Sequence, residues 1–156
     1  MNGYCFDTSA FVEPWNRYYP QDVFPTLWEA LSAQIDQKLI VSPYEVRREV
    51  EAKSDTLFRW LRDRKHMFHD ETLDVIGFMN GEIFAVERFR RITEAGRNGA
   101  DPLVISMARV TGRTVVTNEQ PVGPNSARVK IPTICDHFGI RWLRPLDYYR
   151  ETGIRL

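Results

Sequence analysis

The sequence predicts an α/β protein, a three-layer α/β/α sandwich around a central parallel sheet. Four short apolar runs, each suited to a buried strand, recur along the 156-residue chain. Segments with a helical spacing of apolar residues separate these runs, and strands joined through helices form parallel sheets covered on both faces. A chain of this length with 43% hydrophobic residues is most simply one domain spanning residues 1–156.

The first third of the chain is expected to contain two strands and one helix. Residues 3–6 form the first strand, and residues 13–20, rich in aromatics and proline, form a loop. Residues 26–37 have the period of an amphipathic helix, and residues 39–41 form a second buried strand. The inward face of this helix carries Leu27, Trp28, Leu31 and Ile35.

Helices are expected over the middle of the chain. Ser42 and Pro43 place a cap and a proline at the start of one helix. Asp55 caps a second helix, which turns its apolar residues inward and its basic residues outward. Residues 71–92 form a longer amphipathic helix that two glycines weaken.

The last third returns to alternating strands and helices. One helix over residues 102–110 ends at Gly112, and a shorter one that begins near Lys130 ends at Gly139, because glycine readily adopts the left-handed conformation that stops a helix. The other elements expected here are a loop at residues 96–99, strands at residues 114–116 and 140–143, and a last helix opened by Pro145.

Composition narrows the classes of function. The 21 basic and 21 acidic residues cancel, which argues against bulk electrostatic capture of nucleic acid. Local arginine clusters remain, either as helix faces in solvent or as patches opposite an acidic site. The apolar runs are too short to span a bilayer and no secretory signal is recognised, so we expect a cytoplasmic protein with no membrane partner. Cys5 and Cys135 are expected to be buried thiols.

Three acidic residues stand at the ends of expected elements. Asp7 follows the first strand, Asp101 opens a helix, and Glu119 follows the third strand. Such positions converge at one edge of a parallel sheet, where these folds place their sites. Carboxylates gathered there repel one another unless a cation joins them, and hard oxygen ligands favour Mg²⁺ or Mn²⁺. Each acid also has a structural alternative: an Asx-turn for Asp7, an N-cap for Asp101 and a surface position for Glu119.

A fourth acid is harder to select, because Glu45, Glu49 and Glu51 lie on one expected helix. Val46 and Val50 mark the inward face of that helix. Glu49 lies one turn from Val46 on this side, whereas Glu51 falls on the opposite side. We therefore expect Glu49 to face the other acids.

Two further groups leave a choice between binding and packing. The segment after the first strand contains Trp15, Arg17, Tyr18 and Tyr19. These side chains either contact a substrate, with the rings stacked on bases or a ribose, or pack over the edge of the sheet. His66 and His69 have a spacing that suits a transition metal, but no cysteine or HExxH pattern accompanies them, which favours surface histidines.

Taken in order, these motifs resemble those of the PIN-domain ribonucleases. The family's first motif, an Asp with Ser, Thr or Asn two positions on, is similar to Asp7 and Ser9. Its second motif, a proline, then a valine, then a glutamate three positions further, is similar to the segment from Pro43 to Glu49 and selects Glu49 over Glu45.

The other two motifs also lie in register. An Asp opening a helix that ends in alanine resembles residues 101–108, although Pro102 departs from most members. A strand ending in Thr-x-Asp resembles residues 115–119, although Glu119 stands where the family usually has Asp. A branch of PIN-like proteins with an aromatic insertion after the first motif is more similar still, through Tyr18-Tyr19-Pro20.

The resemblance implies both an activity and partners. The activity is Mg²⁺- or Mn²⁺-dependent cleavage of RNA, often as a toxin with a small antitoxin protein. The oligomeric state is left open, and a homodimer is one of the alternatives. Ser9 and Thr117 would orient the acids through hydrogen bonds. The metal ligands and catalytic acids would be Asp7, Glu49, Asp101 and Glu119.

Two alternatives stay open. A phosphatase of the haloacid dehalogenase type also begins with a strand ending in Asp, but it needs a second Asp where this chain has Ser9. A PIN scaffold that only binds RNA or a partner protein is the non-enzymatic alternative, and Glu119 is the residue that favours it.

Overall fold

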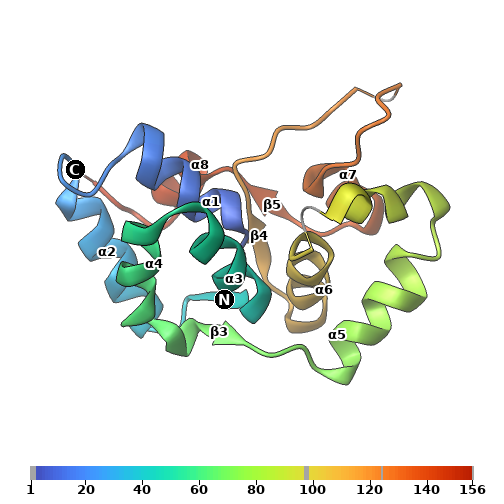
Figure 1. Ribbon diagram of the computed structural model, residues 1–156, viewed down its shortest axis with the longest axis horizontal. Coiled ribbons are helices and arrows are strands. Elements are labelled where there is room, and N and C mark those ends of the chain that lie inside the picture. Colours follow the sequence, from blue (N-terminus) through green and yellow to red (C-terminus); the bar gives the residue numbers. More distant parts are fainter. Residues whose placement is uncertain (1–2, 97–98, 124, 156) are drawn as a thin grey trace.

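A five-stranded, all-parallel sheet forms the centre of the molecule (Figure 1). The structure is a computed structural model that describes residues 3–96, 99–123 and 125–155. The strand order is β3-β2-β1-β4-β5. The strands are β1 (Tyr4–Phe6), β2 (Ile40–Pro43), β3 (Phe68–His69), β4 (Thr114–Val116) and β5 (Trp142–Leu143).

Helices cover both faces of this sheet, so the predicted α/β/α sandwich is confirmed (Figure 1). One layer holds α1 (Thr8–Glu13), α2 (Pro25–Asp36), α3 (Tyr44–Lys53), α4 (Asp55–Arg62) and α8 (Pro145–Glu151). The other layer holds α5 (Leu73–Phe78), α6 (Asp101–Thr111) and α7 (Ile131–Phe138). Short π- and 3₁₀-helical segments are η1 (Pro14–Tyr18), η2 (Lys65–Met67), η3 (Met79–Ile83) and η4 (Glu87–Gly96). Within the described residues, no helix has the length and apolar character needed to cross a lipid bilayer.

The segment after β1 is helical, so the loop predicted at residues 13–20 is wrong. The Asp7 carboxylate accepts a hydrogen bond from the Ala10 amide at 2.8 Å and caps α1. The chain then continues into the π-helix η1 without leaving helical geometry. Pro14 fits this helical path because its φ of -60° is the value that the proline ring fixes.

The predicted caps in the middle of the chain also need correction. Ser42 belongs to β2 and its hydroxyl donates to the Phe6 carbonyl at 2.8 Å, so it joins two strands instead of capping a helix. Ser54, not Asp55, caps α4 by accepting from the Leu57 amide.

The single helix predicted over residues 71–92 is three segments, α5, η3 and η4. The register changes to π-helical at Met79, next to the two glycines that weaken the sequence. Strand β3 was not predicted, because two residues carry no periodicity. By contrast, Gly112 and Gly139 stop α6 and α7 with φ of 70° and 68°, as predicted. Arg97 and Asn98 of the predicted loop lie outside the described residues.

The strand order creates a topological switch point between β1 and β4. From β1 the chain moves outward to β2 and β3, and it then returns to the other side of β1 as β4. The Asp7 amide donates to the Val116 carbonyl at 3.0 Å, which ties the carboxyl ends of the two strands together. Open parallel sheets bind ligands in the crevice outside such a point.

Candidate metal centre

Three carboxylates gather at this switch point. Asp7 follows β1, Asp101 begins α6, and Glu119 lies three residues beyond β4. One oxygen of each lies within 4.8 Å of the others. Asp7 and Asp101 are buried, and the side chain of Glu119 is 15% exposed. The group therefore lies mostly buried at the edge of the sheet, with Glu119 as its more accessible member.

Hydrogen bonds fix the orientation of Asp7. Ser9 Oγ donates to its carboxylate at 2.8 Å and Thr117 Oγ1 donates at 2.7 Å, in addition to the Ala10 amide. Ser9 and Thr117 are the two hydroxyls expected to orient the acids, and both do contact Asp7. Ser9 Oγ also accepts from the Asn118 amide at 2.9 Å, which joins the start of α1 to the segment after β4.

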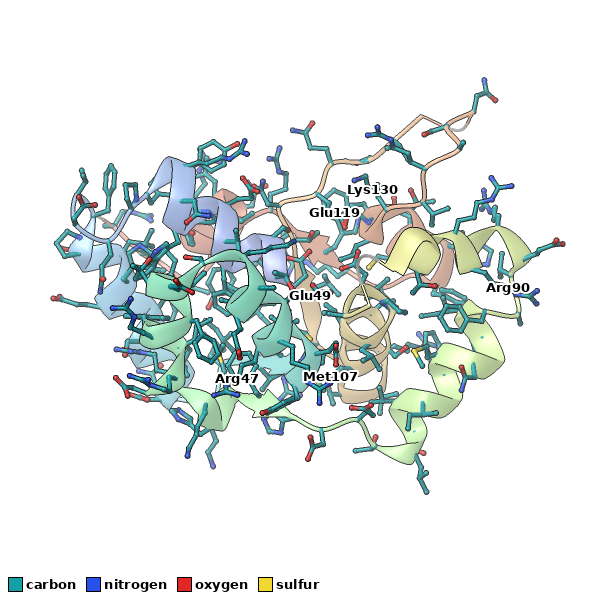
Figure 2. All side chains as sticks on the ribbon, viewed as in Figure 1. Arg47, Glu49, Arg90, Met107, Glu119 and Lys130 are labelled. Atoms are coloured by element: carbon teal, nitrogen blue, oxygen red, sulfur yellow. The ribbon has the colours of Figure 1, made fainter. Side chains whose placement is uncertain are left out.

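Glu49 borders the three acids from α3. Its Oε1 accepts from Thr8 Oγ1 at 2.6 Å, and its Oε2 accepts from the Ala100 amide at 3.1 Å. Both donors neighbour an acid of the cluster, and Figure 2 shows Glu49 and Glu119 in the same central part of the molecule. Glu49 is outside the group of three whose oxygens share the 4.8 Å limit, so it lies around the centre rather than in it.

The neighbouring glutamates of α3 face elsewhere. Glu45 pairs with Arg48 at 3.6 Å, and Glu51 is exposed. The helical spacing therefore selected the glutamate that faces the acids. Thr8, which holds Glu49 in place, was not predicted as part of the site. Its only sequence signal is its position beside Asp7.

Asp101 is not the N-cap that its position before Pro102 suggested. Helix α6 already begins at Asp101, and Ala100 occupies the capping position. Over the ranges that the structure covers, no backbone amide donates to the Asp101 carboxylate. The carboxylate is therefore buried without serving as a helix cap, and the groups that act on it are the neighbouring acids Glu119, Asp7 and Glu49.

Burial and mutual repulsion raise the pKa values of these acids. Burial raises the pKa of Asp7 to about 7, and the charge of Glu119 adds to the effect. Burial also raises the pKa of Asp101 well above its usual range, with contributions from Glu119, Asp7 and Glu49 that Lys53 only partly opposes. The pKa of Glu119 is likewise raised by burial, although Lys130 acts in the opposite direction.

The donor set fits a divalent cation. Lys130 Nζ lies 3.7 Å from Glu119 (Figure 2). Among the described residues, this is the ion pair that involves an acid of the cluster. One ammonium cannot neutralise three largely buried carboxylates. Oxygen ligands without thiol or imidazole suit Mg²⁺ or Mn²⁺. Asp7, Asp101 and Glu119 could hold such an ion, with Glu49 beside them.

The aromatic segment divides into buried and exposed parts. Trp15 is only 9% exposed, stacks edge-on against Trp28 and donates its Nε1–H to Thr56 at 2.9 Å. It packs in the core, as the packing alternative predicts. Tyr18 is 53% exposed, and Arg17 is exposed and paired with Glu13 at 3.1 Å.

The two histidines lie apart from the acids. His66 Nε2 lies 3.3 Å from Asp36, and His69 ends β3. Among the described residues, Asp7, Asp101 and Glu119 form the group of side chains that lie close enough together to hold a metal ion. Neither histidine belongs to this group.

Comparison with known families gives one match. A family model described as "Domain of unknown function (DUF4411)" matches residues 4–156, which is nearly the whole chain. The chain belongs to the DUF4411 family. The match includes all three acids of the cluster and Glu49, and the description names no activity. No curated protein matches the chain.

Proposed function

We propose that this protein is a divalent-metal-dependent endoribonuclease. The observation that carries the proposal is the group of three carboxylates within 4.8 Å of one another at the switch point of a parallel sheet. Asp7, Asp101 and Glu119 would hold Mg²⁺ or Mn²⁺, with Glu49 at their side. The resemblance to PIN-domain ribonucleases supports RNA as the substrate, a toxin role in the cytoplasm and a small antitoxin protein as partner.

The chemistry that such an ion supplies is Lewis acidity, which makes water a better nucleophile and offsets charge on a phosphate. The residues of the chain supply position. Three donors fix Asp7, and Thr8 with the Ala100 amide fixes Glu49. Lys130 sits beside Glu119 with a third of its side chain exposed, where it can attract an approaching phosphate.

One feature favours the non-enzymatic alternative. The ion pair between Lys130 and Glu119 occupies one of the three carboxylates with a cation of the protein itself. A scaffold that binds RNA or a protein without cleaving it needs no metal, so the two functions differ in their response to chelation. A phosphatase receives no such support, because Ser9 donates to both oxygens of Asp7, the carboxylate that would act as nucleophile.

The test compares substrates and two glutamates. Purified protein is incubated with RNA, DNA and a phosphate monoester, each with Mn²⁺ and with EDTA. We expect cleavage of RNA that EDTA abolishes. Glu49→Gln should reduce this cleavage, whereas Glu45→Gln, on the same helix but paired with Arg48, should leave it unchanged. Activity that persists in EDTA would overturn the proposal, and so would cleavage confined to the monoester.

A further inference from the structure

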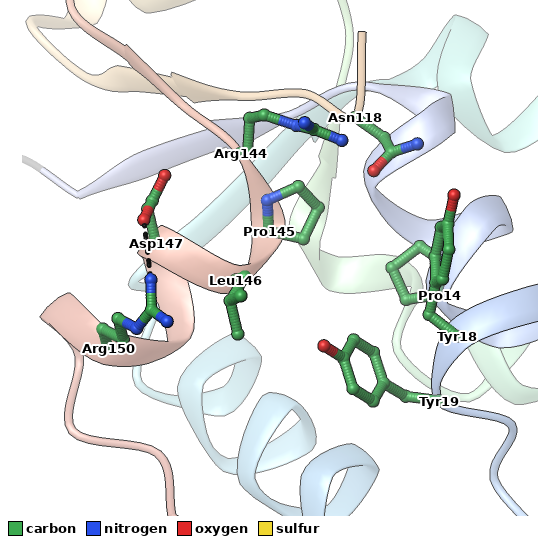
Figure 3. Close-up of a pocket in the computed structure, with 9 residues that line it drawn as sticks. All are labelled: Pro14, Tyr18, Tyr19, Asn118, Arg144, Pro145, Leu146, Asp147 and Arg150. Atoms are coloured by element: carbon green, nitrogen blue, oxygen red, sulfur yellow. Dashed lines mark hydrogen bonds and ion pairs between the residues drawn. The ribbon is translucent and has the colours of Figure 1, made fainter. Parts of the chain in front are cut away.

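A cleft opens beside the metal centre. It has a volume of about 400 Å³, within the roughly 300–1,000 Å³ of small-ligand sites. Its walls come from three parts of the chain: η1, the segment after β4, and the start of α8 (Figure 3). The residues on which the argument rests are Tyr18, Tyr19, Asn118, Arg144, Asp147 and Arg150.

Asn118 connects this cleft to the acids. It stands between Thr117, which donates to Asp7, and Glu119. Its backbone amide donates to Ser9 Oγ, the same hydroxyl that donates to Asp7. One residue therefore forms a wall of the cleft while its two neighbours belong to the metal centre. A ligand that occupies the cleft therefore lies next to the part of a substrate that is bound at the acids.

The aromatic wall of the cleft is rigid on one side and open on the other. Tyr19 packs edge-on against Phe24 and Tyr149, with centroids 5.5 and 5.8 Å apart. The indole of Trp28 donates to the Tyr19 carbonyl at 2.7 Å, which fixes the backbone there. Tyr18 is 53% exposed, and its ring borders the cleft (Figure 3). Aromatic rings held in this way stack on nucleobases whatever their sequence.

The opposite wall carries an arginine whose buried Nε–H has no acceptor among the described residues. Arg144 follows β5, and its Nε is buried without a hydrogen bond to any described residue. Its guanidinium extends toward Asn118 in Figure 3. Arg150, on the same wall, donates through Nη1 to Asp147 at 3.3 Å, whereas the buried Nε–H of Arg144 has no acceptor among the described residues. A buried N–H without an acceptor needs an explanation, and an acceptor bound in the cleft, either a water molecule or a ligand, would provide one.

We propose that this cleft binds one nucleotide of the RNA next to the bond that is cleaved. The base stacks on Tyr18 against the wall formed by Tyr19, and Arg144 donates to the phosphate of the same nucleotide, because a guanidinium presents paired donors that match phosphate oxygens. The inference rests on the proposed function for its substrate, and it adds where the substrate is held and which residues hold it.

The binding test needs no metal and no cleavage. In EDTA, adenosine 5′-monophosphate, ribose 5-phosphate and inorganic phosphate are titrated into ¹⁵N-labelled protein while the Nε–H signal of Arg144 is followed by NMR. We expect adenosine monophosphate to shift this signal and to bind more tightly than the other two. Tyr18→Ala should weaken only the nucleotide, by about fivefold or more. Arg144→Gln should weaken all three, and Arg59→Gln, an exposed arginine of α4, should weaken none.

Several results would overturn the inference. Equal affinity for phosphate and nucleotide, unaffected by Tyr18→Ala, would reveal an anion site with no place for a base. The absence of any binding, with RNA cleaved by Tyr18→Ala and Arg144→Gln as by wild type, would refute the cleft and leave the ribonuclease proposal standing. Nucleotide binding that depends on Tyr18 in a protein that cleaves no RNA would support the cleft and refute the ribonuclease proposal. Since Tyr18 is exposed, its variant tests the cleft even if Arg144→Gln fails to fold.

Discussion

A carboxylate lies at each end of strand β1, and the surroundings shift the two pKa values in opposite directions. At the start of the strand, Tyr4 donates its hydroxyl to Glu151, which also pairs with Arg141. These partners lower the pKa of Glu151 to about 2, with the hydrogen bond from Arg141 as the larger cause. Beyond the end of the strand, burial and the charge of Glu119 raise the pKa of Asp7 to about 7.

The contrast separates stability from function. Glu151 joins α8 to the sheet through the Tyr4 hydroxyl and the Arg141 guanidinium, so its charge favours the folded state. Asp7 is buried beside Asp101 and Glu119, so its charge opposes the folded state until a cation is bound. Both pKa values are perturbed, but only at the Asp7 end do burial and like charge oppose the ionised form, which is the kind of perturbation expected of a functional site.

The largest expected effect comes from Asp101→Asn. The change keeps the shape and removes one charge, so metal-dependent cleavage should fall by at least about 100-fold, on the scale seen when groups around a bound metal are lost. The melting temperature in EDTA should stay level or rise, because like-charge repulsion is relieved and no capping hydrogen bond is lost. Cleavage and thermal unfolding are measured on the same preparations. A variant that melts well below wild type in EDTA would show that Asp101 is structural first.

Thr8→Val tests how the fourth acid is held. Valine matches threonine in shape but cannot donate to Glu49, whose hydrogen bond from Thr8 is 2.6 Å long. We expect Mn²⁺ affinity, measured by calorimetry, to fall about 10-fold, the lower end of what lost supporting contacts cost. The control is Thr111→Val, which removes a hydroxyl that donates within α6 to Met107. Equal losses in the two variants would mean that the hydrogen bond from Thr8 to Glu49 does not support metal binding.

The sequence predicted the acids better than it predicted their supports. The convergence of Asp7 and Glu119 follows from strand order, because parallel strands end at one edge of the sheet. The hydrogen bond from Thr8 to Glu49 spans 41 positions and exists only because α1 packs on α3, which no local pattern encodes. Arg144 was missed for the same reason, since its role depends on what lies across the cleft.

The fold shows the same division. Stops at Gly112 and Gly139 were predicted because a left-handed glycine after an apolar helix is a local signal. The helix after Asp7 was missed because its proline and aromatics are also typical of loops. Strand β3 has two residues, and it is a strand only through its pairing with β2.

The pH dependence of stability should expose the strain at Asp7. In EDTA, the folded state keeps a proton on Asp7 up to about pH 7, whereas the unfolded chain releases it near the ordinary pKa of 3.8. The free energy of unfolding should therefore fall as pH rises from about 4 to 7, by up to about 1.4 kcal/mol per pH unit for this group. Denaturant unfolding at several pH values measures the slope. Saturating Mn²⁺ should flatten or reverse it, because a bound cation displaces the proton.

Glu151→Gln should have the smallest effect and completes the contrast. The side chain of Glu151 is 30% exposed, so solvent screens its charge, and the loss in the free energy of unfolding at pH 7 should be about 1 kcal/mol or less. Because folding lowers the pKa of Glu151, its stabilising effect is fully present at pH values above the ordinary pKa of 4.5. This effect is lost as the pH falls toward about 2. Wild type and variant should thus converge in stability in strong acid, while RNA cleavage stays equal at neutral pH. A loss of cleavage as large as that of Glu49→Gln would mean that the two ends of β1 are coupled, and that the division between a stabilising end and a functional end is wrong.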